Sequence, residues 1–278
     1  MANGEYTGDR VLASYVLMVL FRAISEINES RRCFSEGFLV DSFKSLTGVF
    51  HMSNVKLNAA KSVIGLIPEK GSIGLGSGST VAIFAKELGR RVESGEVDVS
   101  VVPSSYQAYQ LAIDFNIPLT NLDINPELLL TIDGADEVDK ELNLTKGGGG
   151  ALFQEKVVAS ASKKLIIIVD ESKLVEKLAT RFLIPVEVLP FSLGVVKKTI
   201  KKMGIDPILR QAQKKMGPVV TDNGNFIVDL KFPKPIDNPA QVAIDLKMIP
   251  GVMETGLFIG MTDEVHIGTA EGAYILKK

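Results

Sequence analysis

Apolar and polar positions follow one clear rhythm over residues 54–170. Short apolar runs rich in β-branched residues alternate with longer stretches of helical periodicity. The apolar runs are continuous, as expected for parallel strands covered by helices on both faces. This order predicts βαβ units in an α/β fold with a doubly wound, mostly parallel sheet. In such a sheet the loops at the carboxyl ends of the strands converge, and ligands bind there.

The rhythm changes after Ile184. The remaining segments follow a β-α-β-β-α-β order, which predicts a second, smaller α+β domain of the ferredoxin-like type. The last two apolar segments, EVHIG and AYILKK, are typical of a hairpin, and we expect it to return to the first domain. The predicted parts are an N-terminal extension, a catalytic α/β domain, the small domain and the C-terminal hairpin, over residues 1–51, 52–184, 185–260 and 261–278.

The N-terminal segment contains an apolar run from Val11 to Phe21. The run is too short to span a bilayer. Its acidic flanks are unlike those of signal and transit peptides. We therefore expect a helical extension packed on the body or on a partner, with the main domain beginning at Met52.

Composition narrows the possible partners. The chain has 33 acidic and 31 basic side chains, so no strong overall field attracts it to nucleic acid or to a membrane. Cys33 is the only cysteine and the chain has two histidines, which excludes an internal disulfide and a Cys/His zinc site. We expect a reducing, cytoplasmic setting.

The first candidate loop joins a predicted strand to a predicted helix over residues 74–80, GLGSGST. Its glycines allow backbone N–H groups to approach a ligand, and with the helix N-terminus and three hydroxyls they favour phosphate. A merely tight turn is the alternative interpretation. The dinucleotide pattern requires a glycine where Ser79 stands, and the Walker pattern requires a lysine that is missing. The predicted cradle consists of Ser77, Gly78, Ser79 and Thr80.

The second loop, TIDGADEVD, follows the apolar strand LLL and contains Asp133, Gly134, Ala135 and Asp136. Two close carboxylates can hold sugar hydroxyls or shift each other's pKa. A metal site is one alternative, although the spacing does not match a calcium loop and no further magnesium ligands are evident. A solvated acidic turn is the other.

The third loop runs from Lys146 through four glycines to a helix that carries Glu155. Four glycines are entropically costly, which indicates a need for backbone N–H groups near a ligand. Lys146 provides a positive charge for a developing enediolate oxygen. Glu155 could instead only complement the helix dipole. A fourth segment, DESK, places Lys173 after the strand LIIIV, as a capped turn or a further phosphate contact.

All four loops follow consecutive predicted parallel strands, so we expect them to meet. A phosphate cradle, carboxylates, a lysine and a glycine-rich turn suffice for proton transfer between adjacent carbons of a sugar phosphate. No metal or organic cofactor is required for that chemistry. The residues therefore predict an aldose-ketose isomerase.

The motifs GLGSGSTV, TIDGADEVD, KGGGGALFQEK and VDESKL together resemble the A-type ribose-5-phosphate isomerase family, from Met52 to Lys278. The resemblance implies interconversion of ribose 5-phosphate and ribulose 5-phosphate in the pentose phosphate pathway, by a homodimer or homotetramer. It implies that Glu155 moves the proton, that Lys146 stabilises a cis-enediolate and that Asp133 or Asp136 assists ring opening. The substrate-binding residues it implies are Ser77, Gly78, Ser79, Thr80, Asp133, Gly134, Ala135, Asp136, Lys146, Gly147, Gly148, Gly149 and Lys173.

Three departures from the family pattern stand out. Ser77 replaces a frequent threonine and keeps the hydroxyl. Gln154 replaces an arginine that often precedes the glutamate, which leaves the orientation and pKa of Glu155 in question. Residues 1–51 have no counterpart. A non-catalytic sugar-phosphate sensor and an isomerase or deaminase of another sugar phosphate remain as alternatives.

Overall fold

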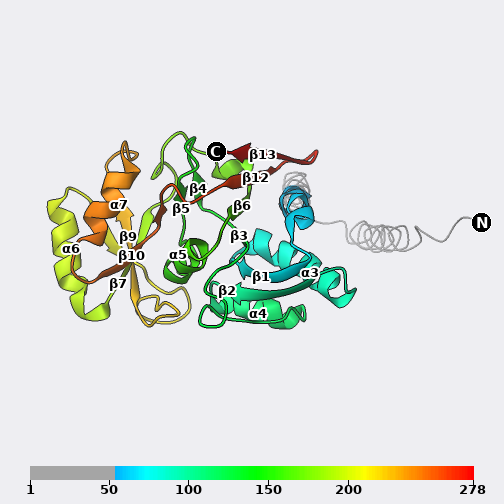
Figure 1. The fold of residues 1–278 in the computed structure, drawn as a ribbon. Helices are drawn as coiled ribbons and strands as arrows, with labels where there is room; N and C mark the ends of the chain where they lie inside the picture. The colour runs from blue at the N-terminus through cyan, green and yellow to red at the C-terminus, as the bar shows by residue number, and fades with distance from the viewer. Residues whose placement is uncertain (1–53) are drawn as a thin grey trace, which may run out of the picture. The chain divides into compact units, whose positions relative to one another are not determined.

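The computed structural model describes residues 54–278. Its largest sheet has the strand order β13-β12-β6-β3-β1-β2 (Figure 1). Neighbouring strands are parallel except for β13, which pairs antiparallel with β12. The predicted doubly wound, mostly parallel sheet is confirmed. The strands are β1 (Lys70–Leu75), β2 (Asp98–Pro103), β3 (Thr131–Asp133), β6 (Leu165–Asp170), β12 (Glu264–Gly268) and β13 (Ala273–Lys277).

Helices in this part of the chain pack through regularly spaced apolar residues. In α3, buried Val81, Phe84, Ala85 and Leu88 recur at helical spacing and join the core beside the sheet. Helix α4 begins where the Ser105 hydroxyl accepts a hydrogen bond from the N–H of residue 108. The elements are a helix over residues 54–62, η1 (Ile64–Leu66), α3 (Ser79–Glu93), α4 (Tyr106–Asp114), α5 (Leu152–Ser160) and η2 (Glu171–Lys173).

A four-stranded sheet with the order β10-β7-β9-β8 forms the second layered unit (Figure 1). All neighbouring strands in it are antiparallel, and two helices pack on the sheet around a separate apolar core. This is the ferredoxin-like arrangement that the sequence predicted. Its elements are β7 (Ile184–Val188), η3 (Pro190–Ser192), α6 (Leu193–Lys202), β8 (Asp206–Leu209), β9 (Phe226–Lys231), α7 (Pro239–Lys247) and β10 (Val252–Thr255).

A third, three-stranded sheet was not predicted from the sequence. It has the strand order β11-β5-β4. Strands β4 and β5 follow β3 in the chain, and β11, which follows β10, pairs with β5. The N–H of Lys146 donates to the carbonyl of Gly256 at 2.8 Å, so this sheet holds the start of the glycine-rich loop. Its strands are β4 (Glu137–Val138), β5 (Leu144–Thr145) and β11 (Leu257–Phe258).

Two sequence expectations are not tested by this fold. The N-terminal extension over residues 1–51 lies outside the described residues, and the domain boundaries at residues 184 and 260 stay predictions. Strand β12 pairs with β6 and carries β13 as the sheet edge. Within residues 54–278, no helix is long and apolar enough to cross a membrane.

Candidate active site

A cavity of about 280 Å³ lies at the carboxyl ends of β1, β3 and β6. The four loops selected from the sequence all line it. Of the predicted site residues only Asp133 is absent from the lining, because its side chain lies beneath the cavity floor and is 1% exposed. For the loops after β1, β3 and β6 the convergence follows from the parallel sheet, which brings strand ends to one edge. The prediction that all four loops follow parallel strands is wrong for the glycine-rich loop, which follows β5 of the antiparallel three-stranded sheet.

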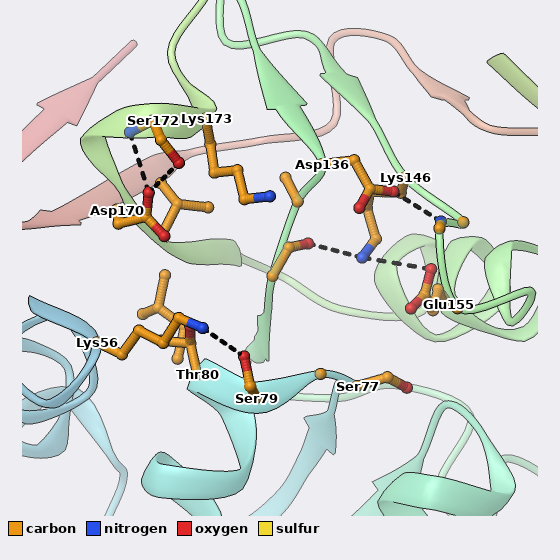
Figure 2. Close-up of a pocket in the computed structure, with 18 of the residues that line it drawn as sticks. Lys56, Ser77, Ser79, Thr80, Asp136, Lys146, Glu155, Asp170, Ser172 and Lys173 are labelled. Carbon is orange, nitrogen blue, oxygen red and sulfur yellow. Dashed lines mark hydrogen bonds and ion pairs between the residues drawn. The ribbon is translucent and has the colours of Figure 1, made fainter. Parts of the chain in front are cut away.

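Lys146 is the charged centre of the buried end (Figure 2). Its Nζ lies 3.0 Å from Asp133 Oδ2 and 3.3 Å from Glu155 Oε2, and donates to the carbonyl of Gly134 at 2.7 Å. Burial lowers the pKa of a lysine, but here the carboxylates of Asp133 and Glu155 outweigh burial and raise the pKa of Lys146 above its ordinary value. The ammonium group therefore stays charged at neutral pH.

Glu155 lies in the first turn of α5 and is 5% exposed. Burial raises its pKa to about 7, against the opposing charge of Lys146 and with a further contribution from Asp133. Near neutral pH the carboxyl group can therefore both release and take up a proton. That property is the one required of a group that moves a proton between two carbons.

Asp133 connects the first two loops. Its Oδ1 accepts hydrogen bonds from the N–H groups of Ser77 at 3.1 Å and Gly134 at 2.7 Å. Residue 76 must be glycine for this approach, because a Cβ atom there would lie 2.2 Å from the carboxyl carbon of Asp133. Asp133 is thus a buried partner of Lys146 rather than a solvated acidic turn.

The glycine-rich loop holds Asp136 at the cavity wall. The N–H of Gly148 donates to Asp136 Oδ2 at 2.7 Å. Gly147 has a φ of +105°, and a Cβ atom there would lie 2.8 Å from a methyl group of Leu152. Among residues 54–278, no three His, Cys, Asp or Glu side chains are grouped to hold a metal ion.

The other end of the cavity is built for an anion. Ser79 and Thr80 begin α3, whose first backbone N–H groups have no partner within the helix. Lys56 Nζ donates to Ser79 Oγ at 3.0 Å, and Lys173 extends into the same end from the opposite side (Figure 2). Two ammonium groups and a helix N-terminus are the kinds of group that bind a phosphate-sized anion.

Two polar lining residues, Lys56 and Gln107, lie outside the four loops selected from the sequence. Lys56 lies on the helix over residues 54–62, before the first strand, where nothing distinguishes it from a surface lysine. Gln107 lies on α4, and its Oε1 accepts from the N–H of Gly78 at 3.0 Å. The neighbouring Ser77 hydroxyl lies 2.6 Å from Ser105 Oγ, so its contact is with the start of α4.

Gln154, which departs from the family pattern, points away from Glu155. Its Nε2 donates to Asn223 Oδ1 at 2.8 Å, and Asn223 Nδ2 donates to the buried Glu187 at 2.9 Å. Gln154 therefore connects α5 to the turn between β8 and β9.

Comparisons with known proteins agree with this geometry. The family model for ribose 5-phosphate isomerase A (phosphoriboisomerase A) matches residues 100–272. Ribose-5-phosphate isomerase A of a Synechococcus strain is 46% identical, over 80% of this chain and 95% of its own length.

Two solved structures are similar over nearly their whole length. Ribose 5-phosphate isomerase A of Methanocaldococcus jannaschii has a TM-score of 0.78 at 42% identity, covering 81% of this chain and 99% of its own. A D-ribose-5-phosphate isomerase in complex with phospho-erythronic acid has a TM-score of 0.79 at 42% identity, with the same coverage. The chain belongs to the ribose-5-phosphate isomerase A family.

Proposed function

We propose that the protein interconverts D-ribose 5-phosphate and D-ribulose 5-phosphate, an aldose-ketose isomerisation of the pentose phosphate pathway. The observation that carries this proposal is the buried pair of Lys146 and Glu155, which lies across one cavity from a site for a phosphate-sized anion. A fixed cation next to a carboxyl group with a pKa of about 7 supports proton abstraction beside a carbonyl group.

Binding begins at the anion end. The phosphate would meet the N-terminus of α3, with Ser79, Thr80 and the ammonium groups of Lys56 and Lys173 around it. The sugar chain would then extend toward Lys146, past the main chain of residues 134–136. These contacts would hold the reacting carbons of the sugar next to Glu155 and Lys146, so that binding energy is used to orient the substrate for reaction.

The reaction itself needs one base and one site for negative charge. Glu155 removes the proton from C2 of the open-chain aldose and returns it to C1, while the hydroxyl proton passes from O2 to O1. Lys146 and the backbone N–H groups of the glycine-rich loop stabilise the negative charge of the cis-enediolate. Asp133 or Asp136 assists ring opening; Asp136 lines the cavity, whereas Asp133 is buried against Lys146.

The test measures ketose formation from ribose 5-phosphate by the purified protein in excess chelator. We expect turnover by the wild type, a loss of roughly 10²–10⁴-fold in kcat for Glu155→Gln, and no change for Glu141→Gln, an exposed carboxylate. Absence of wild-type turnover would overturn the proposal. Loss of activity on chelation alone would point to a metal at Asp133 and Asp136.

Parallel assays with hexose and hexosamine phosphates distinguish the other readings. Binding of ribose 5-phosphate without turnover would identify a sensor, and faster turnover of another sugar phosphate would reassign the substrate. We further propose that the protein acts in the cytoplasm as a homodimer or homotetramer. The single cysteine and the resemblance to the family support this setting and assembly.

A further inference from the structure

One arginine of the four-stranded unit reaches the glycine-rich loop. Arg210 directly follows β8, and its side chain is 18% exposed. Its Nη1 donates to the carbonyl groups of both Gly147 and Gly148, each at 2.9 Å. Its Nε donates to Asp229 Oδ2 at 2.8 Å, and its Nη2 pairs with Oδ1 of the same carboxylate. The guanidinium group is thus fixed on one side by an acid and bound on the other to two consecutive peptide groups.

Peptide geometry gives this contact a consequence inside the cavity. In a trans peptide the C=O and N–H bonds point in opposite directions. The carbonyl of Gly147 shares a peptide with the N–H of Gly148, and the carbonyl of Gly148 shares one with the N–H of Gly149. Because Arg210 holds both carbonyl groups, both N–H groups are turned away from it. The N–H of Gly148 accordingly points to Asp136, and Asp136, Gly148 and Gly149 all line the cavity.

The two N–H groups have different partners. That of Gly148 donates to Asp136 Oδ2, whereas that of Gly149 has no acceptor in the part of the chain that the structure describes. A guanidinium bound to a peptide oxygen also polarises the peptide and strengthens its N–H as a donor. Arg210 therefore acts on the orientation of Asp136 and on a free N–H at once.

We propose that Arg210, fixed by Asp229, is a positioning residue for the isomerisation. It orients the peptide groups of the glycine-rich loop so that the N–H of Gly149 meets the negative charge of the enediolate and the N–H of Gly148 holds Asp136. This inference rests on the proposed function. A purely structural tether between the two sheets would require the same contacts, so the test must separate loss of transition-state stabilisation from loss of fold.

Arg91 provides a matched control. Its side chain is 21% exposed, its Nε pairs with Glu96 at 2.9 Å and its Nη1 donates to the carbonyl of Ile64 at 2.7 Å. It makes the same kinds of contact as Arg210, but Ile64 does not line the cavity. Arg91→Met therefore removes a comparable arginine without touching the glycine-rich loop.

The experiment compares Arg210→Met, Arg210→Lys and Arg91→Met in ribose 5-phosphate isomerisation. For Arg210→Met we expect kcat to fall roughly 10- to 100-fold with a change in KM of less than about threefold. Arg210→Lys keeps the positive charge, but its kcat should fall nearly as far as that of Arg210→Met, because one ammonium group cannot replace the planar guanidinium group with its two parallel donors. Arg91→Met should keep kcat within about twofold of the wild type.

Binding affinities for two ligands give a second test. A purely structural role of Arg210 would lower both affinities together, whereas a positioning role should lower only one of them. Phospho-erythronic acid carries a planar carboxylate in place of the enediolate, so its affinity should fall in Arg210→Met by about the same factor as kcat/KM. The affinity for inorganic phosphate, which binds at the other end of the cavity, should not change.

Each other outcome is decisive. Equal kinetics for the Arg210 and Arg91 variants, with an active wild type, would overturn the inference and leave the proposed function intact. A parallel loss of phosphate affinity would show that Arg210 only maintains the fold. An inactive wild type would refute the proposed function itself. If Arg210→Met does not fold, the kinetics and affinities of Arg210→Lys and Asp229→Asn are compared with those of Arg91→Met instead.

Discussion

Glu155→Gln should lower kcat strongly and, at alkaline pH, make the folded protein more stable. The wild-type carboxyl group is buried with Asp133 and Asp136 as acidic neighbours and with Lys146 as a facing cation, and its pKa is raised from 4.5 to about 7. A carboxyl pKa that is higher in the folded than in the unfolded chain means that ionisation of the group lowers the free energy of unfolding. Glutamine has nearly the same shape and no charge, so it removes that effect.

The magnitude follows from the shift. A difference of about 2.5 pKa units corresponds to about 3 kcal/mol. Below pH 4.5 the carboxyl group is protonated in both folded and unfolded chains, so the variant and the wild type should have nearly the same free energy of unfolding. As pH rises from 4.5 to 7, the wild type loses about 1.4 kcal/mol per pH unit relative to the variant, and above pH 7 the full difference is present.

Thermal unfolding at pH 4 and pH 8 measures this difference. For a chain of this size about 3 kcal/mol corresponds to roughly 6–12 °C in Tm. We expect the variant to have the higher Tm at pH 8 and nearly the same Tm as the wild type at pH 4. Equal Tm values at pH 8, or a difference that does not depend on pH, would refute the reasoning that Glu155 is destabilised by its site.

Glu137→Gln is the control, with the opposite expected sign. The Glu137 side chain is also fully buried, but its two oxygens accept hydrogen bonds from the N–H groups of Ala179, Arg181 and Phe182 and from the hydroxyl of Thr145. A glutamine NH₂ group would face donors there. This variant should lose about 1–3 kcal/mol at pH 8.

Three further outcomes follow from the site. The kcat/KM for ribose 5-phosphate should fall about 100-fold between pH 8 and pH 5, because Glu155 must be ionised, and Asp133→Asn should move this acid limb to lower pH. Lys146→Met should lower kcat by more than about 100-fold with a smaller change in KM, measured in steady-state assays. Gly76→Ala should abolish activity by displacing Asp133, whereas Gly65→Ala, with no atom within 4 Å of the new Cβ, should not.

Sequence patterns predicted the parts of the site that depend on local order. The loops beginning at Ser77 and Asp133 and the segment that carries Lys173 each follow a predicted strand of the parallel sheet, whose topology brings strand ends together. The loop beginning at Lys146 instead follows β5 of the antiparallel three-stranded sheet, which was not predicted. Glu155 could be placed near a helix start but not paired, since its distance to Lys146 depends on how α5 packs. Its raised pKa is a property of burial, which no short sequence window contains.

Other features depend on contacts between distant segments. Strands β4 and β5 have two residues each, too few for a periodic signal, and β5 also pairs with β11, which lies more than 100 residues away in the sequence. Lys56 and Gln107 resemble ordinary surface residues of helices until the fold places them in the cavity. The sequence could not rank them above other lysines and glutamines.

The four-stranded unit contributes no residue to the cavity lining, yet it fixes the geometry of that lining. Its turn between β8 and β9 is held by Glu187, and Asn223 of the turn binds Gln154 next to Glu155. Asp222 of the same turn accepts from the N–H of Tyr106 at the start of α4, and Arg210 holds the glycine-rich loop. These contacts are directional hydrogen bonds, which constrain orientation more closely than apolar packing does. The second unit thus holds α5 and the glycine-rich loop in one arrangement, which is the basis for expecting a residue as distant in sequence as Arg210 to affect kcat.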